Sequence, residues 1–136
     1  MALVLYSLLR RHMKHTGRYF EPGGTSEAPN WSGARPEESV VGWYQNPVPW
    51  QDCWLVFTDK AIYSLDHGSV MRLSISDILD YEFPKSKSDP GGVRVRTPDG
   101  FRFLRATGSF GPDGNQKDAF SLIQVLRALA GRNLRQ

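Results

Sequence analysis

Short apolar runs separated by turn residues occupy the chain from about residue 38 to residue 103, and this pattern constrains the fold most strongly. Within several runs, residues alternate with a period of two, as they do on a strand with one buried face. Turn sequences such as Asp66-His67-Gly68 and Pro98-Asp99-Gly100 separate the runs at hairpin length. The seven candidate strands cover residues 40–44, 53–58, 61–65, 70–75, 78–83, 93–96 and 101–103. The sequence therefore predicts a mainly β, α+β domain built from antiparallel sheets.

Near the C-terminus the apolar residues recur at helical rather than strand spacing. They are Ala119, Leu122, Ile123, Leu126, Leu129 and Ala130. Asp113 or Asn115 can cap the start of such a helix, and Gly131 can end it in the left-handed conformation. The pattern predicts one amphipathic helix docked on the sheets.

The residues before 38 divide into two parts. Residues 2–15 carry Leu5, Leu8 and Leu9 at helical spacing, which predicts a short helix that Gly17 ends. Residues 21–36 are rich in proline and glycine, which favours a linker or a long loop. We therefore expect an N-terminal helical segment (residues 1–20), a linker or loop (21–37) and one domain (38–136).

Composition narrows the class of protein further. A chain of 136 residues is long enough for one self-sufficient core. Its net charge of +3 is too small to argue for nucleic acid. Cys53 is the only cysteine, so the chain has no intramolecular disulfide, and its place in an apolar run predicts a core thiol. No apolar stretch reaches the roughly 18 residues of a membrane span, and Arg10 and Arg11 follow the N-terminal apolar run instead of preceding it. We expect a cytoplasmic protein.

Three segments resemble the pleckstrin-homology-like (PH-like) domain family in its bacterial and GRAM-type branch. Residues 55–63 are similar to the family's apolar strand, Thr-Asp-Lys turn and second apolar strand. Residues 75–78 resemble its short element before the fifth strand, and residues 97–101 its sixth-to-seventh hairpin. The resemblance spans roughly residues 38–131. It implies a seven-stranded, antiparallel, partly open barrel capped by the C-terminal helix, and usually a non-catalytic recognition module.

The first hairpin loop differs from that of the lipid-binding members of this family. Those members place several Lys and Arg residues around the loop, whereas residues 44–52 here contain none. The sequence therefore predicts no selective phosphoinositide binding at this position. Aromatic residues stand there instead, and Trp43, Tyr44 and Trp50 are candidate binding residues because Trp and Tyr are enriched at interfaces. The alternative is that these rings pack in the core.

Arginines on the predicted hairpin form a second candidate site. If Thr97 pairs with Phe101, Arg96 lies opposite Arg102, and Arg94 follows on the same face. Opposed like charges destabilise a strand pair unless an anion or carboxylates neutralise them. Asp80 and Glu82 on the preceding strand can supply a ladder of ion pairs, and an acidic partner is the other interpretation.

Two further basic segments are candidates. Leu5 and Leu9 on the N-terminal helix, followed by Arg10, Arg11 and Lys14, would suit contact with an anionic membrane or a partner. A solvated helix end is the simpler interpretation. Lys85 and Lys87 within residues 84–92 either meet phosphate or belong to a solvated connection.

No catalytic motif is present. The sequence has no Ser-His-Asp arrangement, no glycine-rich phosphate loop and no metalloprotease motif. His12 and His15 are three residues apart on the predicted helix, but nothing marks the further ligands that a metal needs. We expect no enzyme, no cofactor and no metal. The favoured hypothesis is a non-catalytic protein-binding module, such as a small cytoplasmic inhibitor, an adaptor or an immunity-type protein. The alternative is a peripheral membrane module that binds anionic lipid through the N-terminal helix.

Overall fold

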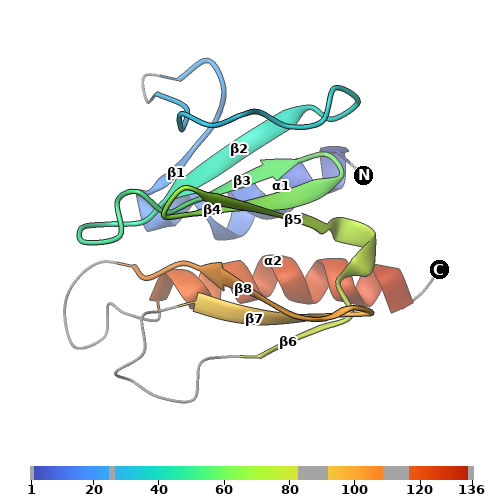
Figure 1. Ribbon diagram of the computed structural model, residues 1–136. Helices are drawn as coiled ribbons and strands as arrows, with labels where there is room; N and C mark the ends of the chain where they lie inside the picture. The colour runs from blue at the N-terminus through green and yellow to red at the C-terminus, as the bar shows by residue number, and fades with distance from the viewer. Residues whose placement is uncertain (1, 25–26, 83–91, 109–116, 135–136) are drawn as a thin grey trace.

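The computed structural model describes residues 2–24, 27–82, 92–108 and 117–134. Within these ranges, eight strands form two antiparallel sheets with a helix near each end of the chain (Figure 1). The five-stranded sheet has the order β1-β2-β3-β4-β5 and the three-stranded sheet the order β6-β7-β8. The elements are α1 (Ala2–His12), β1 (Tyr19–Phe20), β2 (Val40–Gln45), β3 (Trp54–Thr58), β4 (Ala61–Asp66), β5 (Ser69–Ser74), β6 (Asp80–Glu82), β7 (Gly92–Thr97), β8 (Gly100–Arg105) and α2 (Lys117–Leu134). The prediction of antiparallel sheets followed by one helix is confirmed.

The hairpins form where the turn residues predicted them. Between β3 and β4, the hydroxyl oxygen of Thr58 accepts hydrogen bonds from the backbone N–H groups of Lys60 and Ala61, at 3.2 and 2.9 Å. Between β4 and β5, His67 and Gly68 make a two-residue turn with φ of 50° and 87°. Two residues with positive φ match the twist of the flanking strands, which explains the glycine at the second position.

The main core lies between the inner faces of the two sheets and the two helices. In Figure 1, α2 lies between the two sheets and α1 lies behind the five-stranded sheet. The stripe of α2 is buried as predicted, with Leu122, Leu126 and Leu129 fully enclosed. Leu5 and Leu9 of α1 lie in the same cluster. Residues of the first helix therefore belong to the main core.

Strand β1 falls within the segment predicted as helical. Tyr19 and Phe20 pair with Tyr44 and Trp43 of β2 and so extend the sheet by one strand. Two residues are too few to show any periodicity, which is why the sequence pattern did not reveal this strand.

The two sheets remain separate and do not close into a barrel. Among the described residues, no backbone pairing joins an edge strand of one sheet to an edge strand of the other. One end is tied together by buried Asn46, whose Nδ2 donates to the carbonyl oxygens of Cys53 and Arg105 at 3.0 and 3.1 Å. Its Oδ1 accepts from the backbone N–H of Thr107 at 2.9 Å. Asn46 thereby fixes the loop after β2 against the end of β8.

A second, smaller core covers the outer face of the five-stranded sheet. Trp43, Val56 and Tyr63 form its centre, and Trp31 and Ala34 pack on it from the proline- and glycine-rich segment before β2. The segment predicted as a linker or loop is therefore a cover on the sheet. Because both faces of β3 and β4 are buried, these strands are apolar almost throughout.

None of the helices in the described part of the chain is long and apolar enough to cross a membrane.

Candidate functional site

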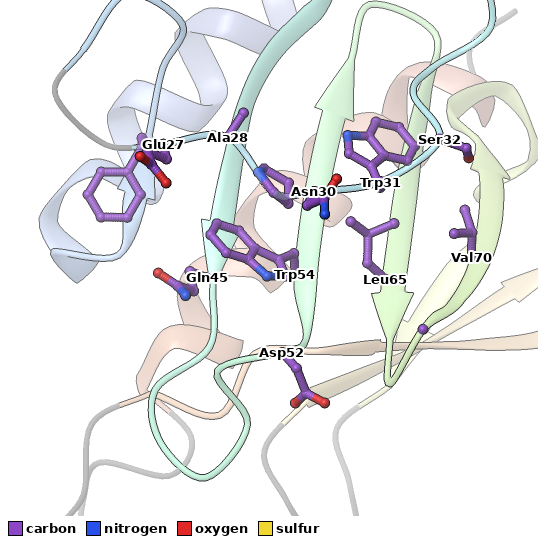
Figure 2. Close-up of a pocket in the computed structure, with 13 residues that line it drawn as sticks. Glu27, Ala28, Asn30, Trp31, Ser32, Gln45, Asp52, Trp54, Leu65 and Val70 are labelled. Carbon is purple, nitrogen blue, oxygen red and sulfur yellow. The ribbon is translucent and has the colours of Figure 1, made fainter.

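A groove of about 830 Å³ opens on the outer face of the five-stranded sheet, beside the covering segment. Its apolar lining consists mainly of Phe20, Trp31, Trp54, Leu65 and Val70. Its polar lining consists of Glu27, Asn30, Ser32, Gln45 and Asp52. Figure 2 shows the covering segment crossing the strands, with the rings of Trp31 and Trp54 over the sheet and Asp52 at the end of the groove. The lining of the groove therefore combines aromatic rings from the sheet and the covering segment with polar side chains.

The covering segment is held in place by a buried carboxylate. Glu38 accepts hydrogen bonds from the hydroxyl of Tyr63 and from Arg72 Nε, the latter at 3.1 Å. The backbone N–H of Arg35 also donates to Glu38, at 3.3 Å. Trp31 packs edge-on against the Tyr63 ring, with 4.9 Å between centroids. These contacts fix one wall of the groove to β4 and β5.

The charge state of Glu38 follows from these contacts. Burial alone would raise the pKa of Glu38, but hydrogen bonds from Tyr63 and Arg72 outweigh burial and lower it. The carboxylate is therefore ionised at neutral pH and keeps its three donors.

The charged side chains that line the described part of the groove are acidic. Among its described lining residues the charged ones are Glu27 and Asp52, and both are exposed. Asp52 is paired with His67, whose Nδ1 lies 2.8 Å from Asp52 Oδ2. This hydrogen bond lowers the pKa of Asp52. A ligand in the groove would therefore meet aromatic rings and carboxylates.

A cluster of polar side chains closes the Asp52 end of the groove. The loop between β2 and β3 supplies Asp52 and Cys53, the end of β4 supplies Asp66, and the turn after it supplies His67. Cys53 Sγ lies 3.2 Å from Asp66 Oδ1 and 3.9 Å from His67 Nε2. His67 Nε2 lies 3.5 Å from Asp66 Oδ1. A sulfur, a nitrogen and an oxygen atom thus lie within 3.9 Å of one another.

The surroundings of Cys53 favour the protonated thiol. Burial and the hydrogen bond to Asp66 raise its pKa to about 12. The thiol donates to Asp66, while His67 Nε2 lies too far away at 3.9 Å for a strong hydrogen bond to sulfur. The Cys53 proton is therefore directed to Asp66 rather than to His67.

An arginine supports the cluster from the three-stranded sheet. Arg105 Nη2 lies 3.3 Å from Asp66 Oδ2. Its guanidinium carbon lies 4.0 Å from the centroid of the Trp50 ring and 5.2 Å from that of Phe103. The Trp50 ring in turn lies 5.6 Å from the His67 ring. Arg105 and the Trp50 ring therefore border the cluster, and the His67 side chain is half exposed.

The structure separates the three aromatic candidates of the first hairpin loop. Trp43 is buried in the outer core, and Tyr44 is fully buried in the main core. The Tyr44 hydroxyl donates to Asp118 of α2 at 2.6 Å. Trp50 alone is half-buried, against Arg105 and His67. Trp43 and Tyr44 are therefore core residues, which was the alternative to a binding role. Trp50 borders the cluster of Cys53, Asp66 and His67.

The predicted register of the arginine hairpin is wrong by one residue. Thr97 pairs with Gly100 because the turn contains only two residues, so Arg96 lies opposite Phe101 and Arg102 opposite Val95. A shift of one residue places a side chain on the other face, so Arg102 does not join Arg94 and Arg96.

The predicted ladder of ion pairs is confirmed. Arg94 lies 3.1 Å from Glu82, and Arg96 lies 4.0 Å from Asp80. The Arg94 guanidinium also lies over the Phe101 ring, at 4.3 Å. These pairs are about half exposed, so they contribute little to stability.

On the N-terminal helix the structure separates the leucines from the basic residues. Leu5 and Leu9 are buried in the main core. Arg10 pairs with Glu21 at 3.1 Å, while Arg11 and Lys14 are exposed. In this arrangement α1 presents charge to the solvent but does not present these two leucines. The candidate lysines Lys85 and Lys87 and the capping residues Asp113 and Asn115 lie outside the described residues.

Sequence reasoning missed the groove and the cluster. Trp31 lies in a segment whose apolar residues follow neither helical nor strand spacing. Trp54 lies in a strand whose alternating residues predicted only the face of the sheet that each side chain occupies. Asp66 and His67 were recognised as turn residues, and Cys53 as a core thiol. No local signal joins Cys53 to His67, because the two residues meet through the pairing of β3 with β4.

Comparison of the chain with protein-family models, with curated proteins and with solved structures found no match in any of the three.

Proposed function

We propose that this chain is a non-catalytic protein-binding module with a PH-like fold, and that the groove on the five-stranded sheet holds a segment of its partner. The observation that carries the proposal is the lining of the groove, in which Trp31 of the covering segment and Trp54 of β3 are the large aromatic residues and Glu27 and Asp52 the charged ones. Aromatic rings are the anchors that most often dominate protein interfaces.

The order of the elements supports the PH-like part of the proposal. Antiparallel strands precede one C-terminal helix that packs on the strands. Two of the segments that carry the resemblance, residues 55–63 and 97–101, are hairpins. A fold assignment of this kind does not itself establish a function, so the binding argument rests on the groove.

The chemistry of the groove favours a basic segment with apolar neighbours. Lys or Arg side chains of a partner would meet Glu27 or Asp52, and their charge would be favourable over the faces of Trp31 and Trp54. An apolar side chain would rest on Leu65 and on Val70, which is 48% exposed. A surface that lies open between a strand and a chain segment suits an extended peptide. The burial of Leu5 and Leu9 gives the membrane alternative less support.

A peptide selection tests the proposal. The immobilised chain is used to select from a displayed library of random peptides, and enriched peptides are synthesised and titrated by fluorescence anisotropy. Val70→Lys adds a cation inside the groove, and Val48→Lys is the matched control because Val48 is 61% exposed and lies outside the lining.

We expect enriched peptides that carry Lys or Arg beside apolar residues. Val70→Lys should weaken their binding by about tenfold or more, since a hot-spot contact is worth about 2 kcal/mol, and Val48→Lys should leave it within about twofold. The proposal is wrong if no peptide is enriched, if the enriched peptides are acidic, or if Val70→Lys binds them as tightly as the unaltered chain.

A further inference from the structure

The cluster beyond the groove has the composition of a zinc site. Thiolate, imidazole and carboxylate are the three side-chain groups that bind Zn²⁺ in proteins. Cys53, His67 and Asp66 bring one of each together from two hairpin loops. A related set, Asp52, Cys53 and His67, also places one ligand atom of each residue within 4.8 Å of the others.

The distances among the three atoms fit a single ion. Sγ of Cys53, Nε2 of His67 and Oδ1 of Asp66 are separated by 3.2, 3.5 and 3.9 Å. A triangle with these sides has a centre about 2.1 Å from every corner, and bonds from zinc to nitrogen, oxygen and sulfur are about 2.0–2.3 Å long. An ion near that centre would reach all three atoms without movement of the backbone.

The surrounding residues have the arrangement expected around metal ligands. Asp52 Oδ2 lies 2.8 Å from His67 Nδ1, which directs Nε2 toward the cluster, as carboxylates do behind zinc-bound histidines. Arg105 holds the other oxygen of Asp66 at 3.3 Å and leaves Oδ1 for the ion. The His67 side chain is 54% exposed, so an ion can enter from solvent and keep a water in the fourth position.

The formal charges also balance with a divalent ion present. When Zn²⁺ binds, the Cys53 thiol releases its proton to solvent, so that Cys53, Asp52 and Asp66 are anionic and Arg105 is the cation beside them. A divalent cation would neutralise the negative charge that Arg105 leaves unbalanced. The soft sulfur ligand excludes Mg²⁺ and Ca²⁺, which prefer oxygen.

From this geometry we propose that Cys53, Asp66 and His67 bind one Zn²⁺ ion, with Asp52 orienting His67. The ion would join the loop before β3 to the turn between β4 and β5. This site is separate from the proposed peptide groove except for Asp52, which borders both, and it stands whether or not the groove binds a peptide.

Metal titration of the full, untagged chain tests the site. After treatment with a chelator, Zn²⁺ affinity is measured by competition with a chromophoric chelator, and Co²⁺ serves as the spectroscopic probe. His67→Asn removes one ligand while keeping a residue that tolerates positive φ. His15→Asn is the matched control, because His15 is an exposed histidine in the short 3-10 helix after α1 and is not part of the cluster.

We expect one Zn²⁺ per chain and a thiolate-to-cobalt charge-transfer absorption that Cys53→Ala abolishes. His67→Asn should weaken Zn²⁺ binding by about tenfold or more, and His15→Asn should leave it unchanged. Zn²⁺ should also raise the melting temperature of the unaltered chain but not that of His67→Asn.

Three results would overturn the proposal: no Zn²⁺ binding, Co²⁺ binding without the thiolate absorption, or equal Zn²⁺ affinity in His67→Asn and the unaltered chain. If Cys53→Ala fails to fold, the absorption of the unaltered chain and the comparison of the two histidine variants still decide the question.

Discussion

Replacement of Glu38 by glutamine tests how the covering segment is attached to the sheet. The Glu38 side chain is fully enclosed, and its carboxylate accepts from Tyr63, Arg72 and the Arg35 backbone. Glutamine has nearly the same shape but presents one oxygen and one amide nitrogen. It therefore loses the charge and cannot accept from all three donors.

The cost of this change follows from the burial of both partners. Removing one partner of a buried ion pair costs about 3–5 kcal/mol, and one hydrogen bond to a charged group contributes about 1.5–3 kcal/mol. The Arg72 side chain is 22% exposed, so water compensates part of the loss. We expect Glu38→Gln to lower the free energy of unfolding by about 2–4 kcal/mol.

Urea unfolding at neutral pH measures this loss, with an unchanged dependence on denaturant as a check that the transition remains two-state. Glu37→Gln is the matched control, because Glu37 is an exposed neighbour of the same type. A loss below about 0.5 kcal/mol, within the usual range of surface substitutions, or a loss equal to that of Glu37→Gln, would refute the argument that Glu38 holds the segment.

The pH dependence provides a second check with a definite sign. The pKa of Glu38 is lower in the folded chain than the value of about 4.3 for a free glutamate. Its stabilisation is therefore complete above that value and is lost as pH falls through the folded-state pKa. The difference in stability between the unaltered chain and Glu38→Gln should be largest near neutral pH and shrink below about pH 4.

Three further predictions concern the core, the alkaline limit and lipids. Leu126→Ala should lower the free energy of unfolding by about 2–5 kcal/mol in the same urea assay, because Leu126 is fully buried at the centre of the α2 stripe; a loss under about 0.5 kcal/mol would contradict the packing. Burial raises the pKa values of Tyr19 and Tyr44, so the stability that each contributes is present below about pH 10 and lost above it. Between pH 9 and 11, the free energy of unfolding of Tyr44→Phe should therefore fall by about 1.4 kcal/mol less than that of the unaltered chain. Equal decreases in the two proteins would argue against a neutral, buried Tyr44. Vesicles that contain phosphoinositide should bind no better than phosphatidylserine vesicles of equal charge at physiological salt, because residues 44–52 carry no Lys or Arg; selective cosedimentation that disappears when this loop is replaced would contradict the prediction.

The hairpins and the C-terminal helix could be read from the sequence because each depends on local chemistry. Gly68 and Gly100 adopt positive φ at turns that the sequence marks. The stripe around Leu126 has the helical period that a buried face requires. The register of the β7–β8 hairpin was missed by one residue, because the choice between a two-residue and a three-residue turn after Thr97 depends on how the strands pair.

The remaining features depend on contacts between distant residues. Strand β1 exists because β2 offers it an edge, and the covering segment is ordered by the contacts of Trp31 and Glu38 with Tyr63. The groove is the space left between that segment and the sheet, so no run of residues encodes it.

The sequence by itself determined the antiparallel strands, their turns, the final helix and the burial of Leu126, since propensity and periodicity act within a few residues. Only the tertiary structure decided that Trp43 and Tyr44 are core residues and that Cys53 lies beside Asp66 and His67. The physical reason is that strand pairing brings Asp66 and His67, which follow Cys53 by thirteen and fourteen residues, to 3.2 and 3.9 Å from its Sγ. No local pattern in the sequence carries that information.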